Sequence, residues 1–243
     1  MPTLPAEVPG VNPYDFDTQV ASVAALGDPV RRALYRYVVA QPGPVNRDQA
    51  AAGVGVPRHV AKFHLDKLEQ DGLLEVEFSR PPGRGGPGAG RPAKLFRRAS
   101  REVAVSLPER RYDLAGRVMA RAITDAERDG LPVADTLHQA ARDAGRSLGQ
   151  DARQQAGPRP THAALLDAAR VVLGRCGFEP RSDAGGLILA NCPFHALAQD
   201  YTDLVCGMNL DLMDGLLDGL GRANLEARLN PAPDRCCVSL CRR

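Results

Sequence analysis

The break between two short helices at residues 53–57 limits most strictly what this chain can fold into. The first helix, "RDQAAAGVG", follows Asn46, a good N-cap, and stops at Gly53 or Gly55. The second begins at Pro57 and runs through "VPRHVAKFHLDKLEQDGLL" to Gly72. Because glycine ends a helix and proline starts one, the stretch predicts two helices joined by a tight turn.

The second of these helices has one apolar and one basic face. Ala61, Leu65 and Leu68 recur at helical spacing and are expected to face the core. In a helix–turn–helix the start of the second helix meets the base edges of the major groove. Arginine and lysine suit guanine or phosphate there. We therefore expect DNA contacts from the outward residues of this helix, which are Arg58, His59, Lys62 and Phe63.

Two strand-like pieces follow, at residues 73–79 and 93–99, around the loop "RPPGRGGPGAGRP". The chain as a whole has a net charge of only +2, yet Phe78–Arg101 holds seven Arg or Lys residues and no Asp or Glu. A local basic strip on a near-neutral protein is typical of a surface that meets nucleic acid. We predict a basic hairpin that contacts phosphates or a minor groove through Arg80, Arg84, Arg91 and Lys94.

Three motifs in this order resemble the winged helix–turn–helix of ArsR/MarR-type bacterial regulators. They are "LGDPVRRALYRYV", "VPRHVAKFHLDKLEQDGLL" and "GRPAKLFR". The resemblance implies a DNA-binding domain over residues 18–105. It also implies a homodimer that binds a palindromic operator in double-stranded DNA.

Residues 110–243 are expected to form a second domain, with long amphipathic helices followed by short strands. The expected strands are 178–181, 187–190, 225–229 and 237–240, and the leucine-rich helix over 208–220 is expected to be core or dimer face. The fold class predicted for the whole chain is mainly α with small β elements (α+β), in which a winged helix precedes an α+β cofactor and dimerisation domain.

The cysteines gather in this second domain, at positions 192, 206, 236, 237 and 241. The sequence has neither a signal peptide nor an apolar run long enough to span a bilayer, so we expect a cytoplasmic bacterial protein without a membrane partner. Thiols stay reduced in the cytoplasm, which favours metal or redox chemistry over structural disulfides. Thiolates bind both iron–sulfur clusters and zinc, and Cys192 with His195 has zinc-like spacing, so spacing alone does not choose.

The segments "NCPFHALA", "LVCGMN" and "RCCV" resemble those of the suf-operon repressor group, which senses iron–sulfur status. The resemblance implies an iron–sulfur cluster, 4Fe–4S in type, bound by Cys192, Cys206 and one or both of Cys236 and Cys237. The 29 residues between Cys206 and Cys236 exceed the gaps of that group. The number of irons in the cluster therefore stays open, and so does the fourth ligand, between His195, Cys241 and the second cysteine of the pair.

Other interpretations remain open. A zinc site or a thiol redox switch can replace the iron–sulfur cluster, and Cys176 is expected to be an inert buried thiol. The sequence holds neither a phosphate-binding loop, a G-x-S-x-G turn nor an H-E-x-x-H helix, so we predict that the chain is not an enzyme. The alternative from a different class is a cofactor-dependent enzyme or ligand-binding protein whose N-terminal part only mediates contacts.

Overall fold

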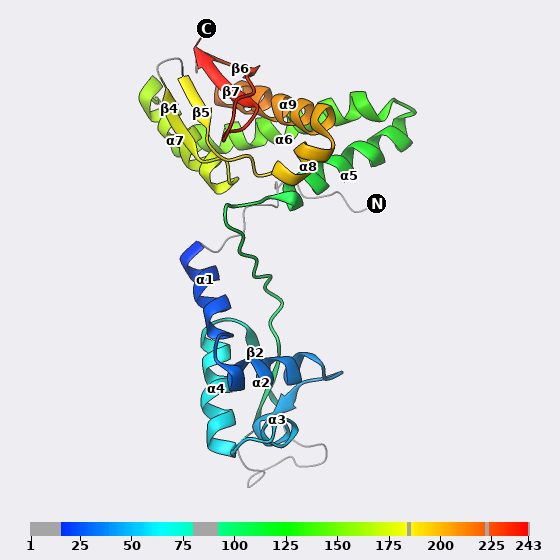
Figure 1. Ribbon diagram of the computed structural model, residues 1–243, viewed down its shortest axis with the longest axis vertical. Helices are drawn as coiled ribbons and strands as arrows, with labels where there is room; N and C mark the ends of the chain where they lie inside the picture. The colour runs from blue at the N-terminus through cyan, green and yellow to red at the C-terminus, as the bar shows by residue number, and fades with distance from the viewer. Residues whose placement is uncertain (1–15, 80–91, 184–185, 222–223, 243) are drawn as a thin grey trace. The chain divides into compact units, whose positions relative to one another are not determined.

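The computed structural model describes residues 16–79, 92–183, 186–221 and 224–242. The chain divides into two compact units, one over Pro13–Val105 and the other holding Ser106–Arg243 (Figure 1). Each unit has its own hydrophobic core. We call them the N-terminal unit and the C-terminal unit and describe each by itself.

The helices of the N-terminal unit begin where the sequence supplies caps. They are α1 (Phe16–Ala25), α2 (Pro29–Val39), α3 (Arg47–Val54) and α4 (Arg58–Gln70). The Asp28 carboxylate accepts the backbone N–H of Arg31 at 2.8 Å at the start of α2. Asn46 and Gln49 form a capping box at the start of α3. These local bonds satisfy backbone donors that a helix leaves free at its first turn.

The turn between α3 and α4 has the form that the sequence predicted. Gly55 adopts a left-handed conformation, with φ of 73°, and ends α3. Gly53 lies against the ring of Tyr37, and a Cβ at this position would stand 2.0 Å from a ring carbon. The inner face of α4 is buried as expected, since Ala61, Leu65 and Leu68 are fully excluded from solvent.

A three-stranded antiparallel sheet completes this unit, in the order β1-β3-β2. Its strands are β1 (Val45–Asn46), β2 (Leu74–Ser79) and β3 (Ala93–Arg98). Phe96, at the centre of β3, pairs with Val76 on one side and Val45 on the other, and it is buried in the core. The predicted hairpin is therefore present, and β1, which is only two residues long, had no pattern that could reveal it. The arrangement is a winged helix–turn–helix.

The C-terminal unit combines long helices with a second antiparallel sheet, in the order β4-β5-β7-β6 (Figure 1). The helices are α5 (Tyr112–Asp129), α6 (Val133–Gln155), α7 (His162–Arg175), α8 (His195–Asp200) and α9 (Thr202–Leu220). The strands are β4 (Pro180–Asp183), β5 (Gly186–Leu189), β6 (Leu225–Leu229) and β7 (Val238–Arg242). The mainly helical α+β composition is as predicted. One detail is corrected, because β7 starts at Val238 and leaves Cys236 and Cys237 in the segment before the strand.

Two helices of this unit touch through their backbones. A Cβ on Gly145 of α6 would lie 1.9 Å from the Leu212 carbonyl oxygen, and one on Gly215 of α9 would lie 2.0 Å from the Arg142 carbonyl oxygen. Gly149 and Gly219 repeat the same relation one turn further along. Only glycine permits this approach, so we name these four residues the glycine contact.

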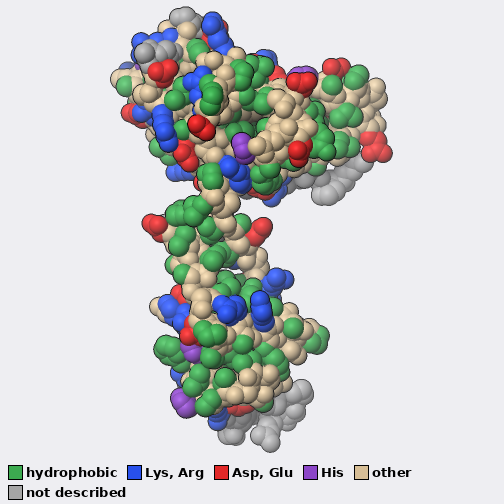
Figure 2. All heavy atoms as spheres, in the orientation of Figure 1, with side chains coloured by type: hydrophobic (Ala, Val, Ile, Leu, Met, Phe, Trp, Pro, Cys, Tyr) green, Lys and Arg blue, Asp and Glu red, His purple; other side chains and the backbone are tan. Residues whose placement is uncertain are grey.

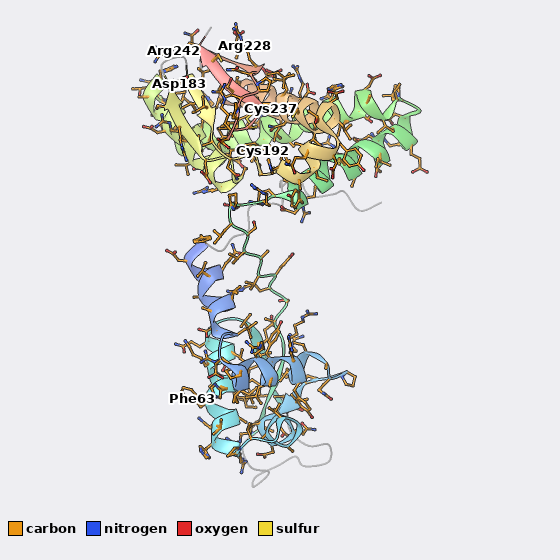
Figure 3. The ribbon with its side chains drawn as sticks, in the orientation of Figure 1. Phe63, Asp183, Cys192, Arg228, Cys237 and Arg242 are labelled. Atoms are coloured by element: carbon orange, nitrogen blue, oxygen red, sulfur yellow. The ribbon has the colours of Figure 1, made fainter. Side chains whose placement is uncertain are left out.

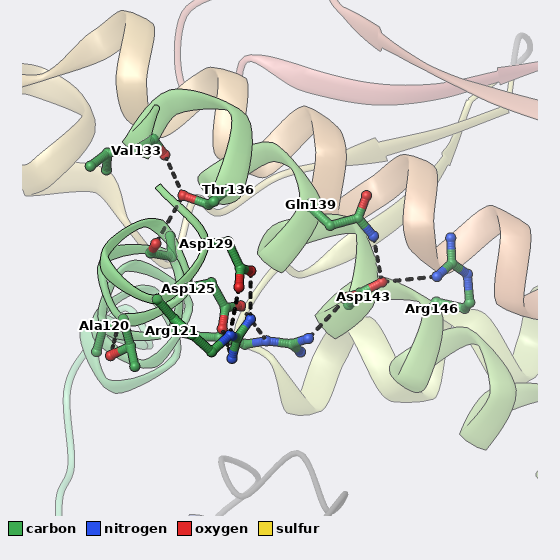
Figure 4. Close-up of polar contacts among 12 residues, drawn as sticks. Ala120, Arg121, Asp125, Asp129, Val133, Thr136, Gln139, Asp143 and Arg146 are labelled. Carbon is green, nitrogen blue, oxygen red and sulfur yellow. Dashed lines mark hydrogen bonds and ion pairs between the residues drawn. The ribbon is translucent and has the colours of Figure 1, made fainter. Parts of the chain in front are cut away.

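Ion pairs flank the helical packing. Beside the glycine contact, the Arg142 guanidinium lies 3.1 Å from the Asp214 carboxylate. On the other side of α6, Arg121 of α5 reaches Asp143 at 3.0 Å, and Thr136 donates its hydroxyl to the Ala122 carbonyl (Figure 4). Acidic and basic side chains are interspersed over the visible face of this unit (Figure 2). Exposed pairs of this kind add little stability each, so the apolar core and the close helix contact hold the unit together.

The glycine contact predicts opposite results for two glycine-to-alanine changes. Gly215→Ala should lower the free energy of unfolding by about 1–3 kcal/mol, because the added methyl collides with a backbone carbonyl. Gly116→Ala, on the open surface of α5 with nothing within 4 Å of its added Cβ, should raise it by about 0.5–1 kcal/mol. Urea denaturation of the two variants measures both. Equal effects would contradict the close packing of α6 on α9.

Candidate functional site

The N-terminal half of α4 presents a polar surface with one aromatic ring. Arg58, His59, Lys62 and Phe63 are all exposed, as the sequence predicted, and 65% of Phe63 is open to solvent. The Phe63 ring points outward from α4 (Figure 3). A single exposed ring is common on protein surfaces, so the cations around it matter more for the assignment than the ring itself. This surface has the composition needed to meet DNA.

Two of these cations already have acidic partners on the same unit. The Arg58 guanidinium lies 2.5 Å from the Asp48 carboxylate, and the Lys62 ammonium lies 3.1 Å from Asp66. The side chains of Arg58 and Lys62 are both more than half exposed. Such pairs contribute little and are screened by salt, so phosphate can replace the carboxylates at small cost.

Lys94 pairs with acidic residues of its own unit, whereas the sequence suggested a contact with DNA. Its ammonium lies 2.7 Å from Asp66 and 2.5 Å from Glu69, and 5.0 Å from the centre of the Phe96 ring. Desolvation lowers the pKa of Lys94, but its hydrogen bonds to the two carboxylates outweigh this and raise it. The structure thus shows Lys94 as a tie between β3 and α4. Arg80, Arg84 and Arg91, the other predicted contacts of the hairpin, lie outside the described residues.

His64 lies on the buried side of α4. It is only 9% exposed, and its ring packs edge-on against Phe63 at 5.2 Å between centroids. Its Nδ1 lies 3.9 Å from the Asp28 carboxylate and has no hydrogen bond. The ring is therefore held by packing.

In the C-terminal unit, the four cysteines predicted as ligands come together from three separate segments. Cys192 follows β5, Cys206 lies near the start of α9, and Cys236 and Cys237 precede β7. The Cys236 thiol lies close enough to those of Cys192 and Cys237 for each to affect its pKa, and the Cys206 thiol stands in the same relation to that of Cys237. We name these four residues the cysteine group. Because β7 begins at Val238, Cys236 and Cys237 lie outside the strand, and its alternation of side chains does not apply to them.

Backbone hydrogen bonds fix two segments of the cysteine group, and α9 carries the third. The Cys236 N–H donates to the Leu189 carbonyl at 2.8 Å, and the Asn230 N–H donates to the Cys237 carbonyl at 2.7 Å. The His195 N–H donates to the Cys192 carbonyl at 3.1 Å and closes a turn there. The sheet and this turn therefore place the thiols before any ligand binds.

The surroundings of Cys192, Cys206 and Cys236 favour the neutral thiol by raising its pKa. A hydrogen bond with Cys236, together with burial, raises the pKa of Cys192, and burial raises the pKa of Cys206. The hydrogen bond with Cys192 lowers the pKa of Cys236, but the bond with Cys237 and burial outweigh it and raise the value to about 11. Binding of a metal would have to displace these protons.

The other candidate ligands lie in different settings. The Cys241 sulfur is 3.6 Å from the Ser239 hydroxyl on β7, where Cys241 pairs with Gly186 and Glu226. The side chain of His195 is exposed at the start of α8. Cys176 is buried in the core at the end of α7, where burial raises its pKa to about 11, in keeping with the inert role expected of it.

Zinc and iron–sulfur clusters both take thiolate ligands, so the type of donor does not choose between them. Among the described residues, no group of three or more His, Cys, Asp or Glu side chains is arranged to hold one metal ion. The cysteine group supplies the kind and number of ligands that an iron–sulfur cluster takes, without deciding between the two cofactors.

The first residues of the C-terminal unit are bonded to the loop that carries Cys192. The Asn191 side chain donates to the carbonyls of Glu109 and Gly177 at 2.8 and 2.5 Å. Its own oxygen accepts from the Arg110 guanidinium at 2.5 Å. Asn191 is only 7% exposed, so these bonds form in a nearly dry site where losing them is costly.

Two further bonds run directly to the backbone beside the cysteine group. The Arg110 guanidinium donates to the Cys192 carbonyl at 3.2 Å, and the Arg111 N–H donates to the Pro193 carbonyl at 3.0 Å. We name residues 109–111 the anchoring segment. It directly follows, in the chain, the link from the winged helix. Sequence reasoning missed Arg110 and Asn191, although Asn191 stands next to a predicted ligand in "NCPF".

Comparison with known proteins identifies the N-terminal unit. Residues 26–77 match the model of a helix-turn-helix domain family. This agrees with the winged helix–turn–helix seen here, a class of domain typical of DNA-binding regulators. No curated protein matches the chain.

One solved structure changes an expectation. The chain is similar to human N-acetylserotonin methyltransferase in complex with SAM, at 18% identity, over 68% of this chain and 58% of that one, with a TM-score of 0.21. The chain thus spans less than two thirds of that enzyme. The prediction that the protein is not an enzyme is corrected by this match and is not retained. The TM-score is too low to support an argument for methyl transfer.

None of the described helices is both long and apolar enough to cross a membrane.

Proposed function

We propose that this protein is a transcription regulator whose cysteine group binds an iron–sulfur cluster that controls its affinity for DNA. The winged helix binds double-stranded DNA, and the C-terminal unit holds the cluster and joins two copies into a homodimer on a palindromic operator. The resemblance to the suf-operon repressor group favours repression of transcription over activation. Cys192, Cys206, Cys236 and Cys237 are the proposed ligands, which leaves His195 and Cys241 without that role.

The observation that carries this proposal is the convergence of the four thiols. They come from segments that are far apart in the sequence, and Cys192, Cys206 and Cys236 are buried. A cofactor held by all three segments would crosslink the sheet to α9. Removing it would free these segments from one another, which gives the C-terminal unit two states that a regulator can use.

The anchoring segment supplies a route from the cysteine group towards the winged helix. Any movement of the Cys192 loop must also move Arg110 or break its bonds to Asn191 and the Cys192 carbonyl. The chain then passes directly into the link to the DNA-binding unit. A hundredfold change in DNA affinity needs about 2.7 kcal/mol of difference between the two states. A few buried hydrogen bonds suffice for this.

A thiol redox switch is the second candidate, and the hydrogen bond between the Cys192 and Cys236 thiols favours it. Iron and sulfide analysis of protein purified without oxygen separates the two. An iron–sulfur cluster gives both elements in similar amounts, whereas a thiol switch gives neither.

We expect the cation surface of α4 to determine DNA affinity. Arg58→Ala or Lys62→Ala should weaken binding about tenfold or more, because each removes a contact to a base edge or phosphate. The measurement is a titration of a DNA fragment selected from random sequence by the unaltered protein. The matched control is Arg128→Ala, an exposed arginine of α5 that is also paired with aspartates. If all three variants bind equally, α4 is not the recognition helix.

We expect the cysteine group to be required for the cofactor. Cys206→Ser and Cys236→Ser should each lose bound iron and sulfide after anaerobic reconstitution, because serine is a poor ligand for the cluster. Cys176→Ser, a buried cysteine outside the group, should keep both. The cofactor-free variants should also differ from the loaded protein in DNA affinity. A Cys206 variant with full iron content and unchanged DNA binding would overturn the proposed function.

We expect the anchoring segment to carry the response. Arg110→Ala should bind iron and sulfide as the unaltered protein does, since it removes no thiol. The ratio of DNA affinities between its loaded and cofactor-free forms should fall towards one, because the bonds to Asn191 and Cys192 are gone. Arg128→Ala again serves as the control. An unchanged ratio in a fully loaded Arg110 variant would show that the signal takes another route.

A further inference from the structure

Asn209 is an unusual residue for its position in α9. It is only 1% exposed and lies in the same core as Met208, Leu212 and Met213, which are all buried. Asparagine is mostly found at the surface, and burying its amide without full hydrogen bonding is costly. Apolar packing therefore does not explain an asparagine at position 209.

The bonds of the Asn209 side chain lead to the cysteine group. Its Nδ2 donates to the Cys236 sulfur at 3.1 Å, a contact that is itself buried. Its Oδ1 is excluded from solvent and has no hydrogen-bond partner. An unsatisfied buried carbonyl costs about 1–3 kcal/mol. The only bond of this side chain in the described structure therefore goes to the sulfur.

The orientation of the amide bears on the state of that sulfur. A thiolate accepts hydrogen bonds and donates none, so it needs an N–H turned towards it. Asn209 turns its N–H towards Cys236 and leaves its oxygen unpaired. Hydrogen bonds to cluster thiolates are one of the means by which proteins set the reduction potential.

α9 brings this donor and a proposed ligand to the same place. Cys206 and Asn209 are three residues apart, so they lie on the same face of the helix. Cys206 contacts Cys237, and Asn209 contacts Cys236. The helix is held on α6 by the glycine contact, which limits how far either side chain can drift.

We propose that Asn209 is a positioning residue that donates its amide N–H to the Cys236 thiolate of the bound cofactor, raising the reduction potential of the cofactor and slowing its loss. The inference rests on the proposed iron–sulfur cluster. Asn209 itself does not bind the cofactor. Outer residues of this kind change metal affinity by about 10–100-fold when they are removed.

The test compares Asn209→Leu with the unaltered protein, both reconstituted without oxygen. Leucine has a similar volume and removes both the N–H and the unpaired oxygen. The midpoint potential of the bound cofactor should become more negative, and iron should pass to a chelator about tenfold faster. A purely structural role for Asn209 would change stability but not the potential. Met208→Leu, a change between apolar residues in the same core, is the matched control and should leave the potential unchanged.

A second pair of variants covers the case in which Asn209→Leu does not fold. Asn209→Ala and Asn209→Ser leave nearly the same space, but serine keeps a hydroxyl donor. The potential of the serine variant should lie closer to that of the unaltered protein. Loaded variants with unaltered potential and unaltered iron loss would overturn this inference and leave the proposed function standing. Unaltered protein without iron and sulfide would instead overturn the proposed function itself.

Discussion

The backbone contact between α6 and α9 is the constraint on which the C-terminal unit depends. Four glycines allow the two helices to meet at distances where any larger side chain would collide with a carbonyl. This approach fixes α9, and α9 in turn carries Cys206 and Asn209 towards the other thiols. The placement of Cys206 and Asn209 is therefore set by helix packing further along α9, because a rigid helix transmits its position along its length.

The cysteine group is assembled by three kinds of structure at once. The sheet holds Cys236 through the Leu189 carbonyl, a turn holds Cys192, and α9 holds Cys206. A hydrogen bond with Cys236 and burial raise the pKa of Cys192, and burial raises the pKa values of Cys206 and Cys236. The unfolded chain has no such site, so the free energy of ligand binding would also be free energy of folding for this unit. That coupling is what the proposed sensing function requires.

In the N-terminal unit, by contrast, local sequence features determine where almost every helix begins and ends. Caps at Asp28 and Asn46 start the helices, Gly55 ends α3, and the apolar positions of α4 recur at helical spacing. Its basic residues are less free than their number suggests, because Asp66 and Glu69 engage Lys94 and Asp48 engages Arg58. Charge counted along a sequence does not show which cations already have a partner.

The sequence by itself determined the order of elements, the helix–turn–helix and the choice of Cys192, Cys206, Cys236 and Cys237 as a candidate group. The first two depend on residue type and local spacing, which the chain carries in its primary structure. The choice of cysteines also depended on the resemblance to the suf-operon repressor group. Only the tertiary structure decided that both Cys236 and Cys237 face the other thiols, that Lys94 turns inward, and that Arg110 bonds to Asn191. These contacts join residues that are distant in the sequence, and they follow from the packing of helices and strands within each unit, which no local pattern encodes.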